Sequence, residues 1–129
     1  MQYTTKLVEL SPLIEEEAVL EIHGQRIVAF INNCPFEIDK GGQYLIEIEL
    51  SILDDFIISQ ADSDGNGIKQ IENGFSHFIS GILNIDSGTI DVGTGILFEI
   101  DREFLFDYGY LHNQYVQIRV DRLSVDFIG

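Results

Sequence analysis

Apolar and polar residues alternate most regularly between positions 42 and 53, and this alternation predicts one long β-strand. The apolar side chains at every second position there are Tyr44, Ile46, Ile48, Leu50 and Ile52. Glutamate or serine stands at most of the positions between them. A period of two buries one face of the chain and exposes the other to solvent, as in a strand and not in a helix. So long a strand with one apolar face needs a curved sheet or a closed barrel to cover it.

Shorter segments of similar character surround this strand. Further strands are expected at residues 3–10, 18–22, 26–31, 75–85, 96–101 and 115–127. The two segments on either side of His23-Gly24-Gln25 predict a hairpin, because glycine accepts the positive φ that a tight hairpin turn requires. Ser11-Pro12 is a typical helix start, with serine as the N-cap and proline at the first helical position. One or two helical turns are therefore expected after it.

The last predicted strand changes its phase. Val116, Ile118 and Val120 share one parity. The later apolar residues, Leu123, Val125 and Phe127, share the other parity. The change around Asp121-Arg122 implies an extra residue, a bulge or a strand that passes from one sheet to another.

Long strands, this phase change and a glycine inside a strand at Gly81 favour an all-β fold. We expect a single domain over residues 1–129, formed by a strongly coiled antiparallel Greek-key barrel of the OB kind. An N-terminal hairpin and at most one short helix complete it. A β-sandwich is the alternative.

Negative charge is the strongest feature of the composition. The chain has 7 lysines and arginines against 22 aspartates and glutamates, a net charge of −15. Residues 42–100 hold 1 basic and 10 acidic side chains, a net charge of −9. Such a field repels nucleic-acid phosphates and anionic membranes, and it attracts a basic protein. Solubility alone also explains it.

The cellular setting follows from what the sequence contains. Cys34 is the only cysteine, which fits a reducing compartment. The N-terminal segment has no apolar core with a small-residue cleavage site after it. Apolar residues never run for the roughly 18 positions that a membrane span needs. A soluble cytoplasmic protein is therefore expected.

The segment from Asp62 to Gly67 has the front half of a calcium loop. Asp62, Asp64 and Asn66 stand at positions 1, 3 and 5, before a glycine at position 6. Hard cations bind oxygen ligands at this spacing. Position 12 should be glutamate and is Asn73. A turn rich in Asx residues and glycine explains the segment better, so calcium is an optional ligand and no other cofactor is expected.

Residues that could support catalysis lack the spacing that catalysis needs. The histidines His23, His77 and His112 form no metal-binding motif. Glu47 and Glu49 share one strand face about 6.8 Å apart, a separation that would suit acid and base catalysis. Alternate acidic residues are, however, what a half-exposed strand ordinarily shows. We therefore expect that the protein is not an enzyme.

Aromatic residues recur at every second position near the C-terminus. In an extended segment they would form one stripe consisting of Phe104, Phe106, Tyr108, Tyr110 and His112. Neighbouring carboxylates disfavour the stacking of nucleobases on it. Phe104 and Phe106 are explained by the core, whereas tyrosine beside carboxylates is typical of protein interfaces.

Together these observations predict an acidic, non-catalytic binding protein. The leading hypothesis is an immunity or inhibitor protein that masks a basic partner such as a nuclease toxin. The residues expected to bind the partner are Glu47, Glu49, Asp91, Glu99, Asp107, Tyr108 and Tyr110. The alternative is a barrel that binds a small ligand or carbohydrate, with the calcium loop as an optional site.

Overall fold

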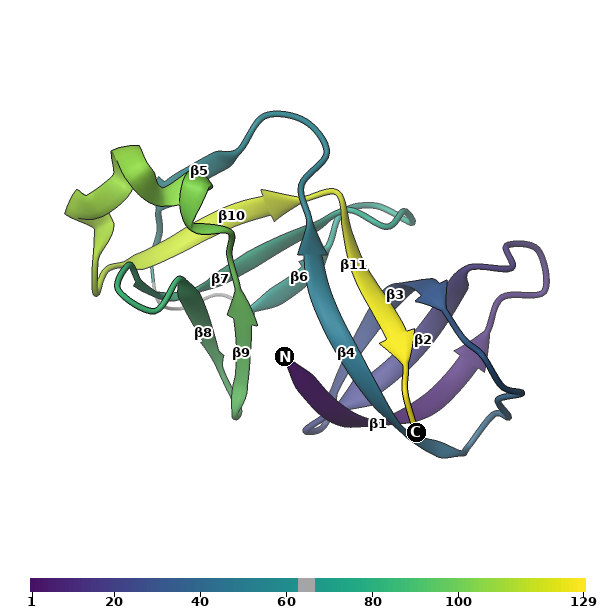
Figure 1. Cartoon of the computed structure of the whole chain (residues 1–129). Coiled ribbons are helices and arrows are strands. Elements are labelled where there is room, and N and C mark those ends of the chain that lie inside the picture. Colours follow the sequence, from purple (N-terminus) through teal and green to yellow (C-terminus); the bar gives the residue numbers. More distant parts are fainter. Residues whose placement is uncertain (63–66) are drawn as a thin grey trace.

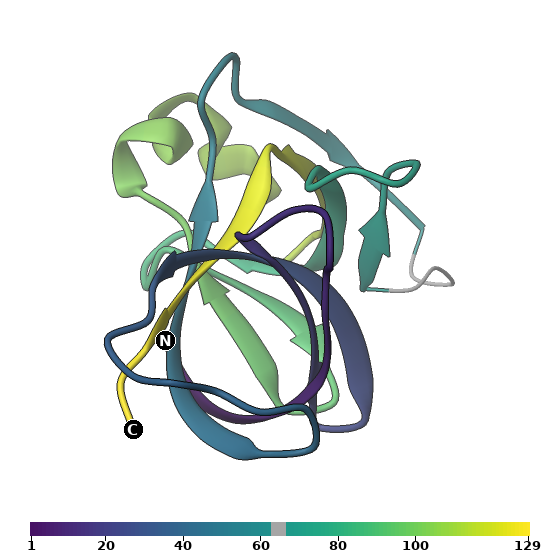
Figure 2. The ribbon, with the colours of Figure 1, turned by 90° about the vertical axis from the view of Figure 1, so that its right-hand side faces the viewer.

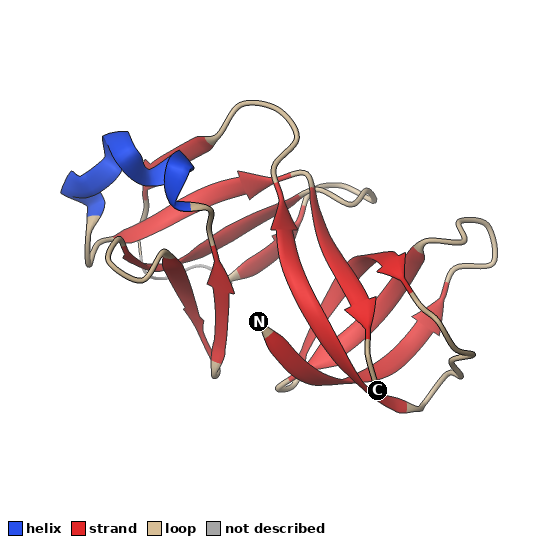
Figure 3. Ribbon diagram, viewed as in Figure 1, coloured by secondary structure: helices blue, strands red, loops and turns tan. Residues whose placement is uncertain are grey.

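The computed structural model describes residues 1–62 and 67–129, and these are mostly β-structure (Figures 1 and 3). One 3-10 helix, η1, accompanies the strands in this part of the chain. The elements are β1 (Gln2–Leu10), β2 (Glu17–Ile22), β3 (Gln25–Asn33), β4 (Gln43–Ser51), β5 (Ile57–Gln60), β6 (Ile68–Gln70), β7 (His77–Asn84), β8 (Thr89–Gly93), β9 (Ile96–Glu99), η1 (Arg102–Leu111), β10 (Tyr115–Val120) and β11 (Arg122–Phe127).

The first sheet contains the N-terminal strands and the last strand of the chain. Its hydrogen-bonded order is β1-β2-β3-β11-β4, and β4 pairs back onto β1, so the sheet closes on itself (Figure 2). The pairing of β3 with β11 is parallel, whereas the other pairings in this sheet are antiparallel. The strand expected at residues 42–53 is confirmed as β4, which lies between β1 and β11.

The second sheet is formed entirely by residues between β4 and β11. Its order is β5-β10-β7-β8-β9, with β6 paired to β7 beside β8. Figure 1 shows this sheet and η1 on one side of β4 and the first sheet on the other. The chain therefore leaves the first sheet after β4, builds a second sheet and returns as β11.

The prediction of a β-fold is confirmed, but the described chain as a whole is not one closed barrel. It divides into two sheets, and only the first closes. This division is compatible with the alternative of a β-sandwich. Alternation alone could not reveal the division, because it marks a strand without naming the sheet that contains it. The phase change at Asp121 allowed a passage between two sheets as one of three explanations.

The phase change at Asp121 has a clear structural cause. β10 ends at Val120 in the second sheet, and β11 begins at Arg122 in the first. Of the three explanations, the passage of one strand between two sheets is the one observed. Because Asp121 alone separates the two strands, the even-numbered apolar residues of β10 and the odd-numbered apolar residues of β11 both face the core. Val120 and Leu123 are accordingly both fully buried.

Two local predictions have different outcomes. The hairpin is confirmed, because β2 and β3 pair antiparallel around His23 and Gly24, whose φ angles are 50° and 80°. The helix expected after Ser11-Pro12 is wrong, and turns occupy this segment instead. The Ser11 hydroxyl accepts hydrogen bonds from the amides of Leu13 and Ile14 at 3.2 and 3.1 Å. The chain must reverse here because Leu10 already pairs with Ala18.

The core extends through both sheets. Its largest fully buried side chains come from β1, β2, β4, β7, β8, β9, β10 and β11. Gly81 in β7 lies at a close crossing, because a β-carbon there would be 2.1 Å from the carbonyl oxygen of Asp91. The glycine inside the predicted strand therefore marks a contact between two backbones.

Candidate functional site

A cleft lined by acidic residues lies where β4 of the first sheet meets β9 of the second. Its volume is about 390 Å³. We call it the acidic cleft, and its lining residues are Met1, Glu47, Ile48, Glu49, Leu50, Ile52, Glu99, Ile100, Asp101 and Phe104. Four of these side chains are carboxylates, and none of the described lining residues is a lysine or arginine.

The alternation of β4 explains one wall of the acidic cleft. Ile46 and Ile48 are buried in the first sheet, so Glu47 and Glu49 between and beyond them point away from the core. Glu49 is exposed, whereas Glu47 is half-buried. The strand pattern that the sequence predicted thus places both carboxylates on one wall.

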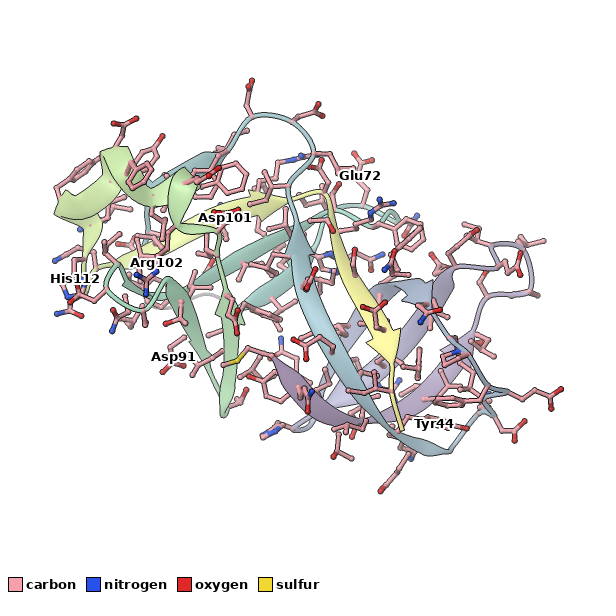
Figure 4. The ribbon with its side chains drawn as sticks, in the orientation of Figure 1. Tyr44, Glu72, Asp91, Asp101, Arg102 and His112 are labelled. Atoms are coloured by element: carbon pink, nitrogen blue, oxygen red, sulfur yellow. The ribbon has the colours of Figure 1, made fainter. Side chains whose placement is uncertain are left out.

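The end of β9 and the start of η1 form the opposite wall. Phe98 and Ile100 are buried, so Glu99 between them is turned outward. Asp101 caps η1, because its Oδ1 atom accepts a hydrogen bond from the amide of Glu103 at 3.0 Å. Figure 4 shows Asp101 where the chain passes from β9 into η1. This hydrogen bond holds Oδ1 of Asp101, and the exposed carboxylate group lies at the rim of the acidic cleft.

One positive group lies among these carboxylates. The amino group of Met1 is 2.5 Å from Oε1 of Glu47 and 3.8 Å from Oε1 of Glu99. It therefore bridges carboxylates from the two walls. Four carboxylates against one ammonium group leave the acidic cleft strongly negative.

The hydroxyl group of Tyr3 joins the two sheets beside the acidic cleft. It donates to the carbonyl oxygen of Leu97 at 2.9 Å and accepts from the amide of Leu97 at 2.7 Å. One phenol thus satisfies both backbone groups of a residue in β9. Because β1 pairs directly with β4, this contact fixes the distance between the two walls.

Asp121 holds the segment that follows β4. Its Oδ2 atom accepts a hydrogen bond from the amide of Leu53 at 2.6 Å, and Arg119 lies 3.3 Å from its Oδ1 atom. These contacts, led by the Leu53 amide, lower the pKa of the Asp121 carboxyl group. The carboxylate at the junction of β10 and β11 thereby fixes the end of one cleft wall.

Aromatic residues extend from the acidic cleft along η1, which corrects the predicted stripe. Residues 102–111 form 3-10 turns with a kink at Tyr108, whose φ and ψ angles are −119° and 21°, so every second side chain does not share a face. Phe104 stacks on Phe56 at 5.1 Å between ring centroids, and Tyr108 meets Phe56 edge-on at 5.7 Å. Phe106 and Tyr110 are 81% and 76% exposed. Phe106 is therefore not a core residue, contrary to expectation.

The structure brings together only some of the residues predicted to bind a partner. Glu47, Glu49 and Glu99 line the acidic cleft. Asp91 does not line it: this side chain accepts a hydrogen bond from the amide of Gly93 at 2.9 Å, and Figure 4 shows it on β8, away from β4.

The remaining three predicted residues lie on η1. Asp107 and Tyr110 are exposed there, and Tyr108 is half-buried against Phe56. Tyr108 and Tyr110 are neighbours, with ring centroids 6.4 Å apart. Asp101 also lines the acidic cleft, although it was not among the residues predicted to bind a partner. The signal for it was an Asx residue directly after a strand and before an aromatic-rich segment, which is a typical N-cap position.

The predicted calcium loop falls largely outside the described residues. Asp64 and Asn66 belong to residues 63–66, which the structure does not describe, and only Asp62 of the three predicted ligands is described. Within the described parts of the chain, no three histidine, cysteine or acidic residues are grouped so that they could hold a metal ion.

A second hollow lies at the end of the first sheet. Its volume is about 670 Å³. The lining residues are Leu10, Glu15, Glu16, Ile31, Asn32, Asn33, Cys34, Phe36, Glu37, Ile38 and Asp39. Cys34 is half-buried, and its thiol donates to the carbonyl oxygen of Phe36 at 3.1 Å. This hollow combines apolar and acidic side chains.

Comparison with known proteins gives a family without an assigned activity. The model of a protein family described as "Uncharacterised conserved protein UCP019853" matches residues 1–128. No curated protein and no solved structure matches the chain. In the described part of the chain, no helix has the length and apolar character required to cross a bilayer.

Proposed function

This chain belongs to the UCP019853 family, and we propose that it is a non-catalytic binding protein whose acidic cleft masks a basic surface of a partner protein. An immunity or inhibitor protein acting on a nuclease toxin would work in this way. The observation that carries the proposal is the convergence of Glu47, Glu49, Glu99 and Asp101 from two sheets on one cleft.

Electrostatics explain how such a cleft would act. Carboxylates gathered between two protein walls focus their field, which raises the local concentration of cations and the rate of association with a basic partner. A lysine or arginine that enters the acidic cleft would meet several acceptors within a short distance. Exposed charge pairs contribute little affinity each, so the benefit lies mainly in steering and orientation.

The aromatic residues on η1 would supply the apolar part of the interface. Tyr110 is 76% exposed, and Tyr108 beside it rests on Phe56. A tyrosine held by packing loses little freedom on binding, which makes it an effective anchor. Phe104 lies in the acidic cleft and stacks on Phe56, so the anchors and the charges form one continuous surface.

We also propose that the first sheet is a barrel of the OB kind. Its five strands close in the order β1-β2-β3-β11-β4, with one parallel pair and a long connection before the last strand. Such small Greek-key barrels present loops and strand faces for binding. The second sheet would then be an insertion that completes the acidic cleft.

Affinity capture at two salt concentrations tests the proposed function. The protein is used as bait in extracts of its own cells at about 50 mM and about 500 mM salt, across which the Debye length shrinks several-fold. We expect a basic partner that is retained at low salt and weakened at high salt. The combined change Glu49→Gln and Glu99→Gln should weaken its retention.

A matched control separates the acidic cleft from total charge. Glu9→Gln combined with Glu72→Gln removes the same charge from exposed positions outside the acidic cleft and outside the hollow at the end of the first sheet. This control should retain the partner. The proposal is wrong if no basic partner is recovered, if retention does not depend on salt, or if the two double variants behave alike.

The hollow at the end of the first sheet favours a second candidate function. Its volume of about 670 Å³ and its mixed lining suit a small molecule or a sugar with apolar and hydroxyl groups. In this alternative the chain is a ligand-binding barrel with an optional calcium loop. A thermal-shift screen of small sugars, with and without millimolar calcium, tests it. No stabilisation by any sugar would remove this candidate, and no effect of calcium would remove its metal site.

A further inference from the structure

The two strands at the ends of the β5-β10-β7-β8-β9 order, β9 and β5, differ in what covers their outer edges. At the edge formed by β9, the Tyr3 hydroxyl bonds to both the amide and the carbonyl group of Leu97. That edge also contacts β4 of the first sheet. The other edge is β5, which pairs only with β10 among the described strands. An open strand edge is a template for another strand unless it is blocked.

The register of β5 shows which of its backbone groups point away from the sheet. Ala61 donates to the carbonyl oxygen of Tyr115 at 2.9 Å, so this residue faces β10. In an antiparallel pair the residues that exchange hydrogen bonds alternate along the strand. Ser59 therefore faces β10 as well, and the amides and carbonyl groups of Ile58 and Gln60 point outward. No backbone partner for these groups is present among the described residues.

We propose that β5 accepts an extended, basic segment of the partner protein as an added strand. This inference rests on the proposed function, because it assigns the partner of the acidic cleft a second contact on the same molecule. The charges around β5 favour that occupant. Asp54, Asp55 and Asp62 flank the strand and are exposed, and residues 54–62 contain no lysine or arginine. Arg119, across from Ile57 on β10, is 3.3 Å from Asp121.

The side chains beside the open edge suit such a segment. Ile57 is 53% exposed on one face of the strand and offers an apolar contact. Phe56 and Ile58 share the opposite face, where Phe56 contacts Tyr108 of η1. Alternate side chains of an added strand would therefore meet the exposed Ile57 on one face and the side of the strand that carries Phe56 and Ile58 on the other. Lysine or arginine alternating with β-branched residues fits this surface, because the flanking aspartates attract cations and Ile57 offers an apolar contact.

Hydrogen exchange of the intact protein tests the added strand directly. The probe is a synthetic peptide of about eight residues in which lysine and valine alternate, a length that spans an ordinary strand. We expect the exchange of the Ile58 and Gln60 amides to slow at least about tenfold at saturating peptide, since each gains a hydrogen bond. The Ser59 amide, already bonded to β10, should change less. A lysine-proline peptide of equal charge cannot pair as a strand and should give no such protection.

Two variants at one position check the geometry. Ile58→Pro removes an outward amide, which an edge strand tolerates, and should abolish protection at Gln60. Ile58→Val keeps that amide and should bind the peptide as the parent does. Absence of protection at both amides in the parent protein, or equal protection by both peptides, overturns the proposal.

The tests of strand addition and of the proposed function can fail independently of each other. Glu49→Gln with Glu99→Gln alters the acidic cleft and leaves β5 unchanged. If this variant still shows protected edge amides but the parent protein captures no basic partner, strand addition stands and the proposed function fails. If capture succeeds and the edge amides stay unprotected with the peptide, the proposed function stands and strand addition fails.

Discussion

Removing one hydroxyl group, in Tyr3→Phe, should loosen the contact between the two sheets beside the acidic cleft. The phenol oxygen makes two hydrogen bonds to Leu97, at 2.9 and 2.7 Å, in a partly buried setting. The ring itself would stay, since Tyr3 packs edge-on against His23 at 5.7 Å between ring centroids. The change therefore isolates the hydrogen bonds from the packing.

The expected loss follows from these two bonds. A hydrogen bond within a protein contributes about 1 kcal/mol net, and a buried group left without a partner costs about 1–3 kcal/mol. Tyr3→Phe removes two bonds but leaves Leu97 partly accessible to water. We therefore expect the free energy of unfolding to fall by about 2 kcal/mol. In a chain of this length that corresponds to a melting temperature roughly 8 °C lower.

Urea unfolding at neutral pH, followed by circular dichroism, measures the change in stability. Tyr110→Phe is the matched control, because it removes the same hydroxyl group from a ring that is 76% exposed. Its effect should stay within about 0.5 kcal/mol, as for most surface substitutions. A loss below about 0.5 kcal/mol for Tyr3→Phe, or equal losses for the two variants, would refute the proposed role of Tyr3 in joining the sheets.

Two further predictions concern the second sheet. Gly81→Ala should destabilise the protein by about 3 kcal/mol or more, because the added β-carbon would lie 2.1 Å from the carbonyl oxygen of Asp91. In the control Gly109→Ala the added β-carbon meets no atom within 4 Å, so this variant should be tolerated. Equal midpoints of urea unfolding for the two variants would contradict the prediction. His77 is 1% exposed, and burial lowers its pKa below the usual 6.5. The free energy of unfolding therefore has its full value above about pH 6.5 and falls as the pH drops below it. Below that pH the His77 imidazole of the unfolded chain takes up a proton, whereas the buried imidazole of the folded chain does not. Urea unfolding at about pH 7.5 and about pH 5.5 measures how much stability each variant loses on acidification. The loss should be smaller in His77→Gln than in the parent protein or in the control His23→Gln. An equal loss of stability in all three proteins would contradict the prediction.

The acidic cleft shows how far alternation alone can identify a site. The outward direction of Glu47 and Glu49 follows from the apolar residues on either side of them in β4, and the same holds for Glu99 in β9. Nothing in the sequence, however, states that β4 and β9 lie together. Their contact depends on the packing of one sheet against the other and on the bonds from Tyr3 to Leu97. Asp91 also stands between apolar residues, Ile90 and Val92, but it lies on β8 outside the acidic cleft.

The segment from Arg102 to Leu111 shows why alternation can mislead. Aromatic residues at every second position fit an extended strand, and the prediction of a stripe followed from this pattern. In the structure Asp101 caps a 3-10 helix, and Phe104 and Tyr108 turn toward Phe56, which is far away in the sequence. Contacts with a distant residue outweighed the local pattern, because burying aromatic rings contributes more free energy than local conformational preference.

The sequence by itself determined most of the longer strands, the hairpin at His23-Gly24, the phase change at Asp121 and the excess of negative charge. Each of these depends on neighbouring residues, since side-chain direction has a period of two and turns are set by a few positions. Only the tertiary structure decided that the strands form two sheets, that four carboxylates share one cleft and that no second described strand pairs with β5. Those outcomes depend on which distant strands pair, and many pairings bury the same apolar faces.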